Sequence, residues 1–266
     1  MTRVARAPRW DPEAPSTARV WNRWLGGTNY GSSDEELARQ LEDACPALPE
    51  MARHARLFSA RVTAWAAAGG ISQFIELGCG LPTSPRVHDV ARSVRAGARV
   101  AYVDNDPAVT DEMDGLLDDG ERDRVAVVNG DLTRPCALMR DARLRAVIDP
   151  AEPCCLLAVG VLHLMSPRRS RSLMESWASL LAPGSVLGIT APVIGSEVMK
   201  AKLARIYRPG AQYDVSPETF AGWLGGLDPV DPGVCAAVHL RPGWRDAPEV
   251  PRGQAYVVAA IGRKRR

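Results

Sequence analysis

The sequence QFIELGCGLPT, which runs from Gln73 to Thr83, decides the fold of this chain. Residues 71–77 form an apolar run that predicts a buried strand, and a Gly-Cys-Gly turn at 78–80 follows it directly. Glycine lets a backbone turn sharply into a helix and lets a ligand approach it closely. Since a helix is expected next, over residues 84–94, this stretch predicts a strand, a ligand-binding turn and a helix in that order.

The rest of the chain repeats this alternation. Further strands are expected at 99–103, 125–128, 154–162 and 185–190, and further helices at 107–117, before Pro183, at 196–207 and at 217–226. Alternation of this kind predicts a mostly parallel α/β sheet with helices on both faces. Two late strands, at 234–240 and 255–261, have no clear helix between them, so we expect an antiparallel hairpin at the sheet edge.

The N-terminal part of the chain contains helix patterns only. Apolar residues recur at helical spacing over 20–25 and again over 51–65. Between these two segments, Ser33 begins a capping-box pattern that predicts a short helix. We therefore divide the chain into a helical N-terminal cap segment, residues 1–70, and a core, residues 71–266, which together form one structural unit.

Composition and charge exclude several classes of protein. The 266 residues are 46% hydrophobic and 24% charged, which is ordinary for a globular protein. The 33 Lys and Arg barely exceed the 31 Asp and Glu, whereas nucleic-acid binding usually requires a basic excess. No apolar run approaches the ~20 residues that span a bilayer, and the N-terminus shows no secretory signal. We expect a cytoplasmic monomer or homodimer with a small-molecule substrate and with no nucleic-acid or membrane partner.

The six cysteines do not form a metal-binding pattern. None belongs to a Cys-x-x-Cys pair, and no nearby histidine completes a zinc site. Cys154 and Cys155 lie within an apolar run and are expected to be small buried hydrophobic residues. We therefore expect no metal ion, and no structural disulfide in a reducing compartment.

A carboxylate before the glycine turn limits the ligand that can bind there. Ligands of such sheets bind beyond the carboxyl ends of the strands, and Glu76 lies near the end of the first strand. Glu76 would repel a pyrophosphate, and Thr83 stands where the dinucleotide-binding fingerprint has its third glycine. These two features disfavour NAD and favour a ligand with an ammonium or sulfonium group, such as S-adenosylmethionine.

Two further acids follow the next two strands. Asp104 ends the second strand, 24 residues beyond Gly80, where an acid can accept hydrogen bonds from a ribose diol. Asp131 follows the third strand, where a carboxylate can accept from the adenine amino group while Leu132 packs on the ring. Any single Asp at such a position can instead cap a helix, and we favour that role for Asp106. Acids after three successive strands together favour a ligand site.

The motifs around these acids resemble those of a known family. The matching stretches are Gly-Leu-Pro-Thr at 80–83 and Val-Asp-Asn-Asp-Pro at 103–107, which are specific, and further segments at 15–27, 73–79, 87–91, 161–163, 182–185 and 231–234. They resemble class I S-adenosylmethionine-dependent methyltransferases. More narrowly, they resemble the actinobacterial S-adenosyl methyltransferase family, formerly a domain of unknown function. The resemblance covers nearly all of the chain after residue 15.

The resemblance implies a Rossmann-like class I methyltransferase sheet with a helical N-terminal cap over a pocket for S-adenosyl-L-methionine. In it, Glu76, Gly78 and Gly80 would hold the methionine end, Asp104 the ribose, and Asp131 with Leu132 the adenine. The implied cofactor-binding residues are Glu76, Gly78, Gly80, Asp104, Asn105, Asp131 and Leu132. Glu76 replaces the Asp that is common in the family and keeps its charge.

Substrate-binding candidates come from the cap segment. Tyr30 and Arg56 could meet a substrate there, although arginines on a helix more often face solvent. The N-terminal Trp21 and Trp24 could line an aromatic pocket, but their spacing favours a core stripe. Departures from the family pattern near Tyr30 leave substrate preference open.

Methyl transfer requires a general base only when the acceptor arrives protonated. His163 is the best candidate of the four histidines, because it follows the fourth strand and that position faces the cofactor in this fold. Its alternative role is structural, and His88 is expected to pack within the helix that follows the glycine turn. We predict an S-adenosylmethionine-dependent methyltransferase that acts on a small molecule in secondary metabolism. The alternative is a sensor or partner module that binds S-adenosylmethionine or S-adenosylhomocysteine without methyl transfer.

Overall fold

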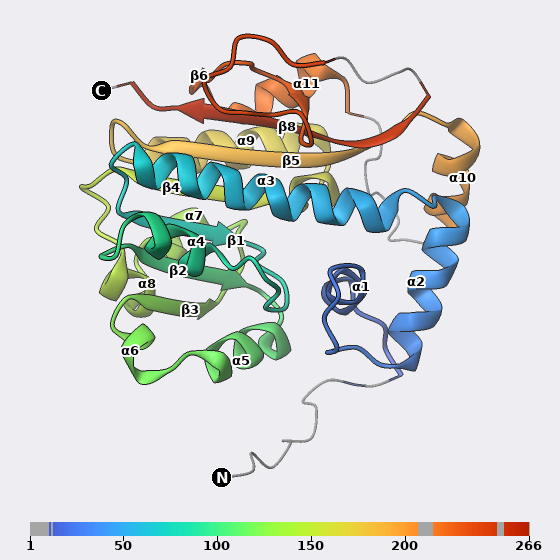
Figure 1. Cartoon of the computed structure of the whole chain (residues 1–266), viewed down its shortest axis with the longest axis horizontal. Helices are drawn as coiled ribbons and strands as arrows, with labels where there is room; N and C mark the ends of the chain where they lie inside the picture. The colour runs from blue at the N-terminus through green and yellow to red at the C-terminus, as the bar shows by residue number, and fades with distance from the viewer. Residues whose placement is uncertain (1–10, 12, 207–214, 249–252, 266) are drawn as a thin grey trace.

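The protein is built around one mixed sheet. The computed structural model describes residues 11, 13–206, 215–248 and 253–265. Its strands are β1 (Gln73–Leu77), β2 (Arg99–Asp104), β3 (Val125–Asn129), β4 (Cys154–Val159), β5 (Val186–Ile194), β6 (Asp228–Pro229), β7 (Cys235–Ala236) and β8 (Ala255–Arg263). They form an eight-stranded sheet in the order β3-β2-β1-β4-β5-β8-β6, with β7 paired to β8 outside this path (Figure 1).

The direction of the strands agrees with the sequence prediction. β1 to β5 are parallel, and β8 runs antiparallel to β5 from the pair Ile194↔Ala255 to the pair Val186↔Arg263. The order reverses at β1, whose neighbours are β2 and β4, so the carboxyl end of β1 lies at the topological switch point. The predicted α/β sheet, mostly parallel with an antiparallel edge, is confirmed.

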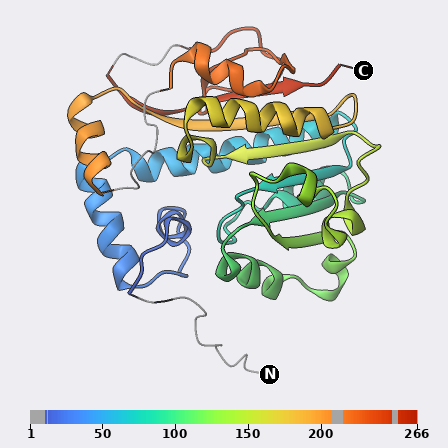
Figure 2. The same ribbon diagram turned by 180° about the vertical axis from the view of Figure 1, so that it is seen from behind.

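Each face of the sheet carries its own hydrophobic core, because successive strand residues point to opposite faces. Phe74 packs with Phe58 in one core, and its neighbour Ile75 packs with Trp177 in the other. The first face is covered by α3 (Leu48–Ala68), α4 (Val87–Val94) and α5 (Pro107–Leu116), and the second by α7 (Pro135–Leu138), α8 (Ala142–Val147) and α9 (Pro167–Leu180) (Figure 2). The short elements α6 (Asp119–Arg122), η1 (Leu162–Leu164), α10 (Glu197–Ile206), α11 (Pro217–Ala221) and η2 (Gly222–Leu224) complete the fold.

Two N-terminal helices lie beyond the carboxyl ends of the parallel strands. They are α1 (Thr17–Trp24) and α2 (Ser32–Ala44), and α3 connects them to the sheet (Figure 1). Residues 1–10 and 12 of the predicted cap segment lie outside the described residues. Within the described ranges, no helix combines the length and the hydropathy that crossing a bilayer requires.

One buried carboxylate holds the start of both N-terminal helices. Asp34 pairs with Arg19, whose Nε lies 2.7 Å from Asp34 Oδ2. Asp34 also accepts hydrogen bonds from the backbone N–H groups of Ser16 and Gly31, each at 2.8 Å. Helix α2 therefore begins at Ser32, after an N-cap at Gly31.

Strand β1 begins at Gln73 rather than at residue 71, and helix α4 and strand β4 are also shorter than predicted. Helix α4 begins at Val87 rather than at residue 84, since Pro85 disfavours helical backbone at the residue before it and Arg86 is extended, with ψ 149°. Strand β4 ends at Val159 because Gly160 adopts a left-handed φ of +69°. His163 consequently lies in the 3₁₀ turn η1 and not on the strand.

The predicted late strand at 234–240 is the largest difference. Only the two residues of β7 pair with β8, and the backbone N–H groups of His239 and Leu240 both donate to Ala236 O, at 2.9 and 3.0 Å, which closes a turn. The 217–226 helix is divided between α11 and η2. The helix expected at 196–207 is α10, and residue 207 lies outside the described residues.

Candidate functional site

The glycine turn after β1 is held against β2 by backbone hydrogen bonds. Gly78 and Gly80 have left-handed φ angles of +63° and +64°, which L side chains rarely adopt. The N–H groups of Gly78 and Cys79 donate to Val103 O at 2.7 and 3.2 Å. A Cβ atom at Gly78 would lie 2.4 Å from Val161 Cγ1, so Gly78 allows β1 and the segment after β4 to approach closely.

Gly80 is different because no atom lies within 4 Å of the position that its Cβ would occupy. Its N–H donates to Asp104 Oδ2 at 3.0 Å, and the N–H of Asp106 donates to Asp104 Oδ1 at 3.0 Å. Burial raises the pKa of Asp104, and these backbone donors partly oppose the rise. Asp106 accepts from the N–H of Ala108, and this confirms its predicted role as an N-cap.

Glu76 forms a buried ion pair with the cap segment. Arg56 Nη1, from α3, lies 2.9 Å from Glu76 Oε1, and Arg56 Nη2 donates to Thr83 O at 2.9 Å. Glu76 Oε2 is also buried, yet it accepts no hydrogen bond from any residue that the structure describes. Burial raises the pKa of the Glu76 carboxyl, and the Arg56 guanidinium partly offsets this rise. Such a carboxylate has a free acceptor for a cationic ligand.

These residues line one cavity at the carboxyl ends of the strands. Its volume is about 480 Å³. It brings together every residue predicted to bind the cofactor, namely Glu76, Gly78, Gly80, Asp104, Asn105, Asp131 and Leu132. Helix α1 forms another part of the wall, with Thr17, Trp21 and Asn22. The cavity therefore lies between the sheet and the N-terminal cap.

The segment after β3 forms another part of the cavity wall. Asp131 is exposed, and its Oδ1 accepts from the N–H of Thr133 at 2.8 Å, which lowers the pKa of Asp131. Trp177 Nε1, from α9, donates to Leu132 O at 3.0 Å and fixes the position of Leu132. Arg169 lines the same cavity and contributes to the low pKa of Asp131.

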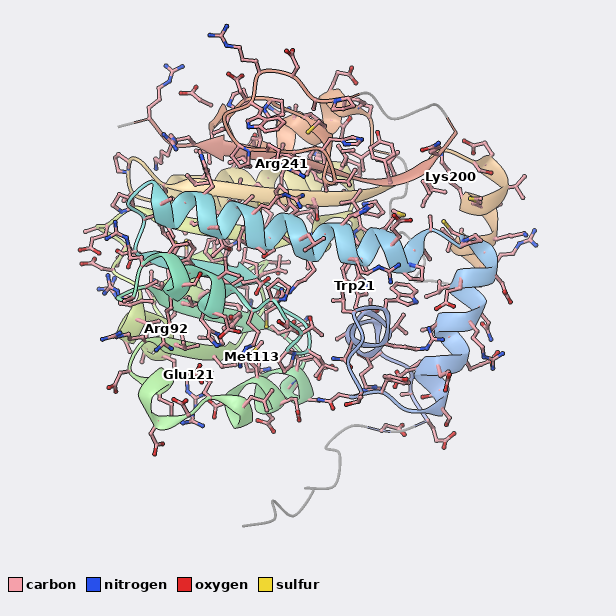
Figure 3. The ribbon with its side chains drawn as sticks, in the orientation of Figure 1. Trp21, Arg92, Met113, Glu121, Lys200 and Arg241 are labelled. Carbon is pink, nitrogen blue, oxygen red and sulfur yellow. The ribbon has the colours of Figure 1, made fainter. Side chains whose placement is uncertain are left out.

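A second, smaller cavity adjoins the first. Its volume is about 50 Å³ and it is lined mainly by apolar side chains, among them Val20, Trp24, Leu41, Met51, Leu203 and Val257. Thr17, Trp21 and Gly160 line both cavities. A Cβ at Gly160 would lie 2.9 Å from Trp21 Cη2, so this glycine lets the indole pack against the end of β4. Figure 3 shows Trp21 projecting from α1 toward the space under α3.

The candidates for catalysis and substrate binding occupy three different places. His163 is buried and lines the smaller cavity, and burial lowers its pKa to about 4. Arg56 lines the larger cavity, but its guanidinium is engaged by Glu76 and Thr83. Tyr30, in the described connection between α1 and α2, lines neither of these two cavities.

Sequence reasoning missed Asn22, a buried polar residue of the cavity wall. Asn22 lies in α1, and its Oδ1 accepts from the N–H of Asn29 at 2.9 Å. Asn29 Nδ2 in turn donates to Glu112 Oε1 on α5 at 2.8 Å, which joins the cap to the core. The Asn22 position within an apolar helical pattern was a usable signal, whereas the Asn29–Glu112 contact depends on tertiary packing alone.

The sheet order, with an antiparallel β8 beside β5 and an acid-lined cavity at the switch point, defines a class I methyltransferase fold. The chain belongs to the S-adenosyl methyltransferase family, whose model matches residues 3–265.

Two solved structures and one further relative agree with this assignment. A crystal structure from Thermobifida fusca, provisionally named a methyltransferase, is 34% identical with a TM-score of 0.87, and the match covers 99% of this chain and 100% of that one. A DUF574 family protein from Streptomyces avermitilis is 28% identical with a TM-score of 0.85, over 96% and 99% of the two chains. A Parafrankia protein, provisionally named an S-adenosyl-L-methionine-dependent methyltransferase, is 28% identical over 86% of this chain and 73% of its own length.

The protein is thus an S-adenosylmethionine-dependent methyltransferase, and its cofactor is S-adenosyl-L-methionine. Two observations of the structure support the fit of this cofactor to the cavity. Glu76 Oε2 is a buried acceptor without a hydrogen-bond donor among the described residues, and it suits a cationic group. The open space at Gly80 leaves room for a ligand against the backbone.

Proposed function

We propose that the chain transfers a methyl group from S-adenosylmethionine to a small-molecule acceptor, as part of secondary metabolism. The observation that carries the proposal is the pair of adjoining cavities, one lined by acids and glycines and the other by apolar side chains. Pockets of about 300–1,000 Å³ are typical of small-molecule sites, and the larger cavity, at 480 Å³, is within that range.

For the cofactor, we assign a separate role to each acid of the larger cavity. Glu76 Oε2 would accept from the ammonium group, with Gly78 and Gly80 shaping the wall beside it. Each oxygen of Asp104 already accepts one backbone N–H, and its second lone pair is available to a ribose hydroxyl. Asn105 borders the same region of the cavity, and Asp131 with Leu132 would bind the adenine.

For the acceptor, we assign the region where the two cavities meet. Bound S-adenosylmethionine supplies an electrophilic methyl group on its sulfonium. The chain's own contribution is to place an acceptor beside Trp21 and Gly160 and to exclude water from it, which are the main requirements of such a transfer. The smaller cavity is lined mainly by apolar side chains, with His163 as a polar exception, and this lining favours an acceptor with a small apolar portion.

His163 is the candidate general base of this proposal. Burial lowers its pKa to about 4, so its imidazole is neutral at pH 7 and is able to accept a proton, but it is a weaker base than an exposed histidine. We expect His163→Gln to lower turnover and to leave the affinity for S-adenosylmethionine unchanged. Full turnover in His163→Gln would instead assign this histidine to the packing of the smaller cavity.

The proposal is tested by incubating the purified protein with S-adenosylmethionine and pools of secondary metabolites, and by measuring S-adenosylhomocysteine together with methylated products. Product formation that requires both the protein and a pool supports transfer to a small molecule. If the protein binds S-adenosylmethionine in calorimetry but forms product only with a protein or nucleic-acid fraction, the small-molecule assignment is wrong. Binding without product in every fraction would favour the alternative, a sensor or partner module.

A further inference from the structure

A group of metal-ligating side chains lies outside the methyl-transfer site. His88 on α4, its neighbour Asp89, and Glu121 on α6 place one ligand atom each within 4.8 Å of one another. None of the three lines either of the two cavities described above. Figure 3 shows Glu121 near Arg92 at the junction of α4 and α6, and Arg92 Nη1 lies 3.8 Å from Glu121 Oε1.

The imidazole of His88 is buried and directed at the two carboxylates. The residue has no exposed surface, and its Nε2 makes no hydrogen bond to any described residue. Nε2 lies 3.4 Å from Asp89 Oδ1 and 3.3 Å from Glu121 Oε1. In a tetrahedral zinc site with bonds of about 2.0–2.2 Å, two ligand atoms are separated by about 3.3–3.6 Å. The two distances from Nε2 lie within this range, so the three ligand atoms are close enough to share one ion.

The side chains around the cluster hold it in this arrangement. His88 Nδ1 lies 2.8 Å from Tyr102 Oη, and an outer partner for the second ring nitrogen is usual for a histidine that ligates a metal. Glu121 Oε2 accepts from the N–H of Asp118 at 3.0 Å, which leaves Oε1 facing His88. Arg86 donates to both oxygens of Asp89 at 2.8 and 3.1 Å.

We propose that His88, Asp89 and Glu121 bind a divalent transition-metal ion of the zinc type that fastens α4 to α6. Zinc commonly takes three protein ligands and one water in this way, although with a single histidine the donor set is rich in oxygen. The positive charges of Arg86 and Arg92 partly neutralise the two carboxylates, which weakens purely electrostatic binding of a cation. A hard cation such as Mg²⁺ prefers oxygen ligands alone, so we expect it to bind less tightly than an ion that also bonds to imidazole. This ion would act on stability, because its three ligands join α4 to α6 and none of them lines the cavity. This site departs from the expectation of no metal ion, which rested on the cysteine pattern alone.

The test uses the full chain, without an affinity tag, after treatment with a chelator. The exposed thiol of Cys136 is removed by Cys136→Ser, so that it does not bind zinc. In this background we measure zinc binding by calorimetry, the thermal midpoint of unfolding with and without Zn²⁺, and the visible spectrum with Co²⁺. At zinc concentrations about 100-fold above Kd, the midpoint should rise by about 5 °C or more.

Glu121→Gln is the decisive variant, because its amide oxygen still caps Asp118 while one ligand charge is lost. We expect at least the ~10–100-fold loss of zinc affinity that follows loss of an outer metal partner, and no rise of the thermal midpoint. The matched control is Glu175→Gln, which removes an exposed carboxylate that pairs with Arg171 on α9 and should leave zinc binding unchanged.

Three outcomes would overturn the proposal: no binding of zinc, an equal rise of the midpoint in Glu121→Gln, or an equal effect of Mg²⁺. If Glu121→Gln does not fold, the Co²⁺ spectrum of Asp89→Asn decides instead, and an unchanged spectrum contradicts the proposal. None of these measurements involves S-adenosylmethionine, so their result is independent of the proposed methyl transfer.

Discussion

Arg56 Nη1 lies 2.9 Å from one oxygen of Glu76, while the second oxygen of Glu76 accepts no hydrogen bond from a described residue. The pair joins α3 of the N-terminal cap to the strand before the glycine turn. The second contact of Arg56, to Thr83 O, fixes the far end of that turn. Arg56 is thus placed to position the cofactor wall, although its residue type and helical location suggested contact with substrate.

Replacing Arg56 by Met should therefore weaken cofactor binding. The variant leaves a buried Glu76 carboxylate without its cation, which typically costs about 3–5 kcal/mol of stability. We expect calorimetry to show a larger Kd for S-adenosylmethionine and thermal unfolding to show a lower midpoint. Arg53→Met, at an exposed position on the same helix, is the control. An unchanged Kd for the cofactor together with a raised KM for the acceptor would instead indicate that Arg56 binds the substrate.

Asp104→Ala should weaken the binding of S-adenosylmethionine by about 1–3 kcal/mol, the usual cost of losing hydrogen bonds to a charged group. The loss has two sources, since Asp104 also accepts from Gly80 N and so shapes the glycine turn. Calorimetry measures it directly. Asp141→Ala removes a comparable Asp that caps α8, and it should reduce stability without changing the affinity for the cofactor. Equal affinities in the two variants would remove Asp104 from the site.

Gly78→Ala and Gly80→Ala should separate packing from ligand contact. Both force a residue with a side chain into left-handed backbone, at about 1–2 kcal/mol. At Gly78 the new Cβ also meets Val161 at 2.4 Å, whereas at Gly80 it meets no atom within 4 Å. We expect Gly78→Ala to be the less stable protein in urea unfolding. A Gly80→Ala protein that is as unstable as Gly78→Ala would contradict this reading of the turn.

His163 should make the protein less stable in acid. Its pKa falls from 6.5 to about 4 on folding, so between these values the unfolded chain binds the proton more readily. The contribution of neutral His163 is complete above pH 6.5 and decreases as the pH falls toward 4, by ~3 kcal/mol at most. Urea unfolding of the protein and of His163→Gln at several pH values isolates the contribution of His163 to the free energy of unfolding. Parallel stability curves would show that the histidine does not titrate in this way.

The carboxyl ends of the first three strands were predictable because each depends on local pattern. Buried strands read as apolar runs, and the acids that follow them, such as Asp104 and Asp131, lie at the shared edge of any parallel sheet. All of the predicted cofactor residues accordingly line one cavity. The late strand at 234–240 was wrong over most of its length, because turn hydrogen bonds to Ala236 O replace the sheet ladder there.

The contacts of the cap depend on tertiary packing, which spacing does not encode. Nothing around residue 56 indicates that its partner is Glu76, 20 residues later. The position of His163 depends on where β4 ends, and one glycine with left-handed backbone shortened that strand. The link from Asn29 to Glu112 spans 83 residues. Such contacts decide how the acceptor region is closed, and so the sequence indicates the cofactor more readily than the acceptor.

The indole of Trp21 has a consequence for the order of binding. Because this ring lines both cavities, a movement of the ring changes the shape of both. If S-adenosylmethionine binds first, it would fix the position of the ring and so complete the acceptor site. Release of S-adenosylhomocysteine would free the ring again and weaken the binding of the methylated product beside it.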